Sequence, residues 1–117
     1  QTLWVDRETD LDAVTALSGS GPAYVFYWVE AMVAAAVQMG LSAEQGKRLA
    51  LATFDGATAL AAQSDEPVGT LRERVTSKGG TTFAALESMR GDGVAEAVVR
   101  AVRAAQRRAA ELGDTFG

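Results

Sequence analysis

A glycine-rich segment with several hydroxyl side chains and one lysine holds the clearest candidate chemistry in this sequence. It reads Val75-Thr76-Ser77-Lys78-Gly79-Gly80-Thr81-Thr82-Phe83 and runs directly into a helical pattern. Adjacent glycines let backbone N–H groups turn toward a ligand where a helix begins, and the start of a helix favours negative charge. The segment is therefore typical of an anion site. The alternative is a glycine turn followed by a threonine N-cap, with no ligand.

The composition excludes several other kinds of chemistry. The chain has 117 residues, 48% hydrophobic and 22% charged, which is typical of one soluble globular domain. It contains no cysteine and no histidine, so disulfides, thiol nucleophiles, Cys/His zinc sites and a histidine base are ruled out, and we expect no metal site. A net charge of −4 argues against a nucleic-acid partner. No signal-peptide pattern opens the sequence, and a cytoplasmic location is expected.

The remaining residues predict helices that position this segment. A short apolar pattern ends at Ser18-Gly19, and Pro22 suits the first turn of the next helix. Ser42 and Gln45 have the spacing of a capping box. Asp65-Glu66-Pro67 starts a helix that stops at the glycines, and Asp92-Gly93 precedes the last helix. The predicted helices cover, in order, residues 11–17, 23–39, 43–63, 65–78, 83–90 and 94–112.

The helix over residues 23–39 is apolar on nearly every side, with Glu30 as its one charge. A membrane span is the first alternative, but the run is slightly short, carries a carboxylate and stands alone among amphipathic helices. A small domain buries only about two-thirds of its surface by itself. The pattern therefore predicts a central helix that a second subunit helps to cover.

Two motifs in this sequence resemble those of pyrroline-5-carboxylate reductases. Val75-Thr76-Ser77-Lys78-Gly79-Gly80-Thr81-Thr82 is similar to the family signature, and Asp12-Ala13-Val14-Thr15-Ala16-Leu17-Ser18-Gly19-Ser20-Gly21-Pro22-Ala23-Tyr24 resembles the segment that opens the family's helical domain. The motifs stand in the expected order and at the expected distance, and the resemblance runs from about Trp4 to the C-terminus.

The resemblance implies an all-α dimerisation domain of about five to six helices that interlocks with a second subunit. Residues 1–10 would be a linker from a missing N-terminal dinucleotide-binding domain, and residues 11–117 the helical dimerisation and substrate-binding domain. The family reduces pyrroline-5-carboxylate to proline with NADPH or NADH. Because residues 1–117 lack a complete G-x-G-x-x-G fingerprint, they are expected to bind no cofactor and to be inactive alone. The implied partners are the small-molecule substrate and a second copy of the chain, with higher oligomers left open.

The resemblance also implies roles for particular residues. The hydroxyl of Ser77 and the amides around Gly79, Gly80 and Thr81 would hold the substrate carboxylate. Thr82 matches the threonine whose hydroxyl contacts the substrate nitrogen, and a hydroxyl can both accept from an iminium N–H and donate to an amine. Lys78 departs from the family pattern, in which proline is common, and no catalytic role is expected for it beyond added positive potential.

Two rival functions follow from the same sequence. β-Hydroxyacid dehydrogenases also join a helical domain to a dinucleotide-binding one, but they place a catalytic lysine in the helix after a glycine-rich segment. The helix after Gly19-Ser20-Gly21 contains no lysine. The other rival is a helical module that only dimerises. An upstream dinucleotide-binding domain in the coding frame would exclude it.

Overall fold

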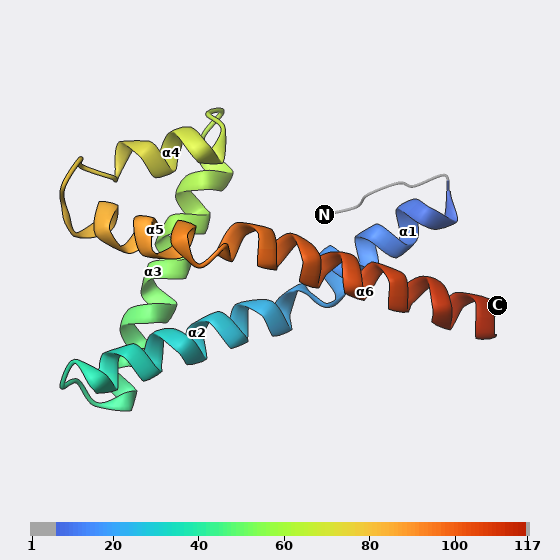
Figure 1. The fold of residues 1–117 in the computed structure, drawn as a ribbon, viewed down its shortest axis with the longest axis horizontal. Helices are drawn as coiled ribbons and strands as arrows, with labels where there is room; N and C mark the ends of the chain where they lie inside the picture. The colour runs from blue at the N-terminus through green and yellow to red at the C-terminus, as the bar shows by residue number, and fades with distance from the viewer. Residues whose placement is uncertain (1–6, 117) are drawn as a thin grey trace. The chain divides into compact units, whose positions relative to one another are not determined.

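The computed structural model describes residues 7–116, and all regular structure in that range is helical (Figure 1). The predicted all-α class is confirmed there. The sequence Gln1-Thr2-Leu3-Trp4-Val5, whose pattern is typical of a short β-strand, lies outside the described residues. The elements are α1 (Glu8–Val14), a π-helix η1 (Thr15–Gly19), α2 (Gly21–Gln38), α3 (Ala43–Gln63), α4 (Val68–Arg74), α5 (Thr81–Gly91) and α6 (Val94–Phe116).

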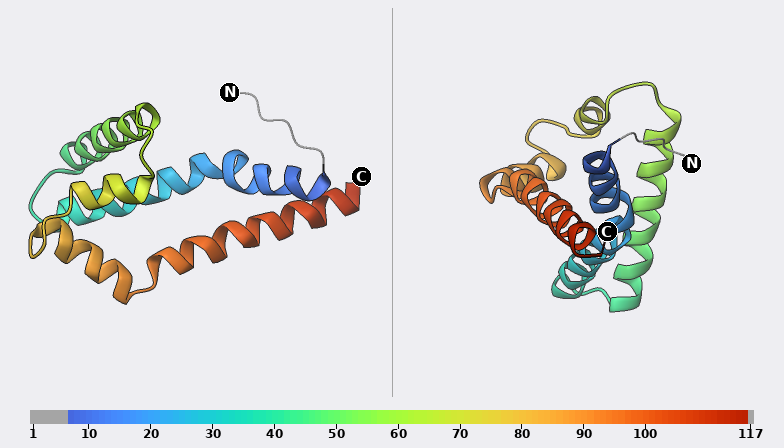
Figure 2. Two further views of the ribbon diagram at one scale, coloured as in Figure 1. Left: turned by 90° about the horizontal axis from the view of Figure 1, so that it is seen from above. Right: turned by 90° about the vertical axis from the view of Figure 1, so that its right-hand side faces the viewer.

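The chain folds into two compact units, one built from residues 7–25 and 89–116 and the other from residues 26–88. In the first unit, α1, the π-helix and α6 pack on one another, and Figure 2 shows α1 and α6 running side by side. Ala16 is the buried centre of this packing. The Tyr24 hydroxyl donates a hydrogen bond of 2.6 Å to the Ala16 carbonyl oxygen, which ties the start of α2 to the π-helix.

Helix α1 begins at Glu8, three residues before the predicted start at Leu11. Arg7 occupies the N-cap position, and its guanidinium pairs with the Asp10 carboxylate at 2.9 Å. The backbone amides of Asp10 and Leu11 both donate to the Arg7 carbonyl. Acidic side chains in a first turn are favoured by the helix dipole, and this polar signal extends the helix beyond its apolar positions.

In the second unit, α3 begins with the predicted capping box. The Gln45 amide donates to Ser42 Oγ at 3.1 Å, and the Ser42 amide donates to Gln45 Oε1 at 2.9 Å. Helix α3 then packs closely against α2 at Gly46. A Cβ atom added at Gly46 would lie 2.7 Å from the Ala36 Cβ and 3.4 Å from the Val33 Cα. Absence of a side chain at Gly46 therefore sets the distance between the two helices.

The core of the single chain is small. Within the described residues, the buried hydrophobic side chains are those of Ala16, Val29, Ala36 and Ala50. By contrast, Phe26 and Tyr27 on α2 are 66% and 75% exposed. No helix within residues 7–116 combines the length and the apolar character that a membrane crossing needs.

Substitution of Gly46 by alanine should destabilise the fold although alanine normally favours a helix interior. The new methyl group would meet Ala36 at a distance that real Cβ atoms do not adopt, so α2 and α3 must separate. Gly56→Ala is the matched control on the same helix, because no atom lies within 4 Å of its added Cβ. We expect Gly56→Ala to gain about 0.5–1 kcal/mol and Gly46→Ala to lose at least 1 kcal/mol in denaturant unfolding at equal protein concentrations. Equal gains in both variants would contradict this packing.

Candidate functional site

The candidate site is residues 75–82, between the end of α4 and the start of α5 (Figure 1). Helix α4 ends at Arg74, so the predicted continuation to the glycines is wrong. The Val75 amide donates to the Arg72 carbonyl at 3.3 Å, and the Thr76 amide donates to the Glu73 carbonyl at 3.1 Å. These bonds of i→i−3 type tighten the last turn and end the helix before the glycines are reached.

A tight turn follows the helix. The Gly80 amide donates to the Ser77 carbonyl at 3.0 Å, and Gly79 has a φ angle of +78°. Within residues 7–116 the positive φ angles belong to glycines alone, so Lys78 has a negative φ. A four-residue turn with positive φ at its third residue and negative φ at its second is of type II. This geometry explains the glycine at position 79, and it places Lys78 where a type II turn favours proline.

Helix α5 begins directly after the turn. The Ala84 amide donates to the Gly80 carbonyl at 3.1 Å, which makes Gly80 the N-cap residue. Thr82 is thus the second helical residue, and the alternative in which Thr82 caps a helix that begins near Phe83 is wrong. Within residues 7–116, the backbone amides of Thr81 and Thr82 have no hydrogen-bond partner. These donors point out from a helix start, where an anion is favoured.

The structure brings the predicted site residues together on one accessible segment. Ser77, Gly79, Thr81 and Thr82 are exposed, and Gly80 is half-buried. The Thr82 hydroxyl takes part in no hydrogen bond within residues 7–116, so it is available to a ligand. Phe83 and Leu86 of α5 are half-buried. The segment therefore offers hydroxyls and free amides, which can bind a carboxylate.

Part of the support for this segment was not predicted from the sequence. The Glu66 carboxylate pairs with the Arg74 guanidinium at 2.6 Å and links the residues just before α4 to the end of that helix. Thr76 is half-buried, and its hydroxyl donates to the Arg72 carbonyl at 2.6 Å. A hydroxyl residue four positions after a carbonyl in a final helical turn is the sequence signal for such a bond.

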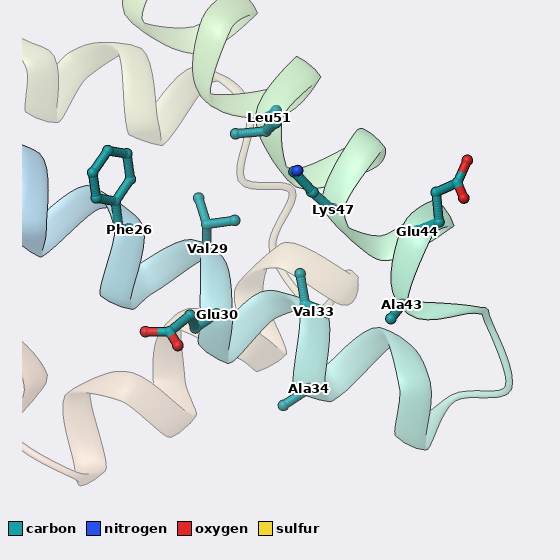
Figure 3. Close-up of a pocket in the computed structure, with 9 residues that line it drawn as sticks. All are labelled: Phe26, Val29, Glu30, Val33, Ala34, Ala43, Glu44, Lys47 and Leu51. Carbon is teal, nitrogen blue, oxygen red and sulfur yellow. The ribbon is translucent and has the colours of Figure 1, made fainter.

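A second feature of the same unit is an apolar groove of about 780 Å³ between α2 and α3 (Figure 3). In Figure 3, Phe26, Val29 and Val33 of α2 lie across the groove from Leu51 and Lys47 of α3. No group of three or more acidic, histidine or cysteine side chains within residues 7–116 is arranged to hold a metal ion. The mostly apolar lining of the groove suits it to apolar contact.

The fold and site define a class, an all-helical domain with an exposed type II turn that leads directly into a helix start. Within that class, the chain belongs to the pyrroline-5-carboxylate reductase dimerisation family, whose model matches residues 8–112. It is 47% identical over 115 residues to a pyrroline-5-carboxylate reductase of Pseudomonas aeruginosa, covering 98% of this chain and 42% of that one. It is 43% identical over 110 residues to pyrroline-5-carboxylate reductase 2 of Bacillus subtilis, covering 94% and 40%.

Solved structures show the same fold. A pyrroline carboxylate reductase of Plasmodium falciparum, with NADP bound, matches with a TM-score of 0.88 and 38% identity over 92% of this chain and 44% of that one. A pyrroline-5-carboxylate reductase of Coxiella burnetii matches with a TM-score of 0.89 and 41% identity over 94% of this chain and 41% of that one. The chain thus spans only about two-fifths of the length of these relatives.

Substitution of Lys78 by proline should stabilise the fold. The second residue of a type II turn has a φ angle close to the one that proline imposes, and the Lys78 amide makes no hydrogen bond within residues 7–116. The ring restricts the unfolded chain, so we expect a gain of about 0.4–1 kcal/mol in denaturant unfolding. Lys78→Ala is the control and should give no such gain. A proline variant less stable than the alanine variant would show that the turn is not of type II.

Proposed function

We propose that this chain is the C-terminal dimerisation and substrate-binding part of a cytoplasmic enzyme that reduces 1-pyrroline-5-carboxylate to L-proline with NADPH or NADH. The observation that carries the proposal is the family match over residues 8–112, which includes the exposed turn and its free amides. The relatives from Pseudomonas aeruginosa and Bacillus subtilis carry the name of this activity. The reaction is the last step of proline biosynthesis.

The turn binds the carboxylate of the substrate. The Ser77 hydroxyl and the amides of Gly79 and Thr81, which are unpartnered within residues 7–116, bind it at the start of α5, whereas the Gly80 amide, expected to bind it too, already closes the turn on the Ser77 carbonyl. The site needs no cation, because helix-start amides carry partial positive charge. This anchoring fixes one end of a small rigid ring. Binding at the carboxylate orients the ring, so that its imine carbon faces one direction.

Thr82 contacts the ring nitrogen. Its hydroxyl lies one residue beyond the amide of Thr81, on the first turn of α5, and is free within the described residues. A hydroxyl accepts from the iminium N–H of the substrate and donates to the lone pair of the product amine, so one side chain serves both ends of the reaction. A bond to the charged iminium is the stronger of the two.

The hydride would come from a nicotinamide cofactor held by an N-terminal dinucleotide-binding domain. The residues that precede α1 would form the connection to it, because residues 8–10 of the expected linker belong to that helix. When bound there, the cofactor would supply the hydride that converts the C=N bond of the protonated imine to a C–N single bond, leaving an amine. The residues of this chain orient the ring for that transfer and hold its charge. A structure of the Plasmodium falciparum relative with NADP bound supports the assignment of the cofactor.

A second copy of the chain covers the groove between α2 and α3. The groove is lined mainly by apolar side chains, and the Phe26 ring that borders it is 66% exposed in one copy. Exposed apolar surface of this extent marks an interface in a soluble protein. The family is named for dimerisation, which agrees with this assignment. The assembly is therefore a homodimer at least, with α2 as its scaffold.

Substitution of Thr82 tests the site. Thr82→Val keeps the shape of the side chain and removes a hydrogen bond to a charged group, which is worth about 1.5–3 kcal/mol. In the complete enzyme, kcat/KM for pyrroline-5-carboxylate should fall roughly ten- to a hundredfold, whereas Thr82→Ser should keep most activity. Because Thr82 is exposed and is not the N-cap, the valine variant should unfold within about 0.5 kcal/mol of the wild type. Normal turnover by the valine variant would contradict the assignment.

The dimer is tested by light scattering on the chain at micromolar concentration. We expect a mass twice the 12.2 kDa of one copy. Phe26→Glu places a charge in the groove and should shift the mass toward one copy, because an unpaired charge is costly to bury. Val68→Glu is the matched control, since Val68 is 70% exposed and lies outside the groove. A folded, stable monomer of the unmodified chain would disprove the dimer.

A further inference from the structure

Thr76 joins the end of α4 to the candidate site through two hydrogen bonds. Its hydroxyl donates to the Arg72 carbonyl at 2.6 Å, and its amide donates to the Glu73 carbonyl at 3.1 Å. The side chain is half-buried, unlike those of its neighbours Val75 and Ser77. Thr76 is therefore held at both its backbone and its side chain by carbonyls of the last turn of α4.

This anchoring acts on Ser77, which is the next residue. The Ser77 carbonyl accepts the Gly80 amide at 3.0 Å and so closes the type II turn. Ser77 is thus fixed from one side by the turn and from the other by Thr76. Within residues 7–116, the Ser77 hydroxyl makes no hydrogen bond of its own that would fix its direction. The direction in which the chain leaves α4 then decides where that hydroxyl and the turn amides lie.

We infer that Thr76 is a positioning residue for the substrate carboxylate, acting through the hydrogen bond from its hydroxyl to the Arg72 carbonyl. The inference rests on the proposed function of the turn. Thr76 does not touch the substrate. Its hydroxyl joins the start of the loop to the last turn of α4. Ser77 and the loop amides are therefore already in position before the carboxylate binds. Preorganisation of this kind lowers the cost of binding.

The role predicts an effect on KM that is separate from any effect on kcat. Loss of the Thr76 hydrogen bond loosens the carboxylate end of the substrate, whereas the contact of Thr82 with the ring nitrogen is unchanged. A hydroxyl that served only to end α4 would instead lower thermal stability and leave the kinetics of the folded enzyme intact. The split between KM and kcat therefore distinguishes positioning from a purely structural role.

The experiment measures steady-state reduction of pyrroline-5-carboxylate by the complete enzyme carrying Thr76→Val or Thr76→Ser. Valine keeps the branched shape and removes the donor, and we expect KM to rise roughly three- to tenfold, the factor of one neutral hydrogen bond, with kcat within about twofold of the wild type. Serine keeps the donor and should restore KM to within about twofold. Thr53→Val is the matched control, because the Thr53 hydroxyl donates to the Leu49 carbonyl at 2.8 Å, also four residues back, but lies inside α3.

Each outcome decides the inference. A raised KM in Thr76→Val, with rescue by serine and normal kinetics in Thr53→Val, supports it. An unchanged KM in Thr76→Val, or a serine variant as impaired as the valine variant, overturns the role of Thr76 while the proposed function stands if the wild type is active. A wild-type enzyme that does not reduce pyrroline-5-carboxylate overturns the proposed function and this inference together.

Discussion

The main physical constraint on this structure is that a single chain buries little apolar surface. The buried hydrophobic side chains within residues 7–116 include Val29 but are otherwise alanines, which contribute little transfer free energy each. Large apolar side chains stay exposed along α2. Helices in proteins owe most of their stability to the packing of their apolar faces rather than to helix propensity. In the proposed homodimer, a second copy of the chain supplies that packing.

The candidate site lies at the end of the short helix α4, in the loop that follows it and at the start of α5. Residues 75–80 have few apolar side chains of their own to bury, so local hydrogen bonds and the φ angle of Gly79 define their shape. The Gly80 to Ser77 hydrogen bond closes the turn, and the Gly80 carbonyl then accepts the first bond of α5. Gly80 thus both completes the turn and starts the helix whose first amides would face the proposed ligand. Anion binding of the kind proposed there depends on backbone geometry more than on side-chain charge.

Much of this structure could be predicted from the sequence, because its determinants lie close together in the chain. The capping box of Ser42 and Gln45 and the place of Pro22 in the first turn of α2 involve residues up to three positions apart, and both are confirmed. The glycine-rich segment was likewise predicted to end in a helix start. Local chemistry of this kind is readable without knowledge of the tertiary structure.

The features that could not be predicted depend on contacts or on competition between local bonds. The π-helix is held by the Tyr24 hydroxyl on the Ala16 carbonyl, eight residues away, which no helical period reveals. Helix α4 ends early because amides after Arg74 turn back to its carbonyls, and α5 begins early because Gly80 takes the cap position expected of Thr82. The central claim is that this turn binds the substrate carboxylate. A crystal structure of the complete enzyme with proline tests it most directly: the carboxylate should lie within hydrogen-bond distance of Ser77 Oγ and of the amides of Gly79 and Thr81, and a carboxylate bound away from residues 77–82 would contradict the claim.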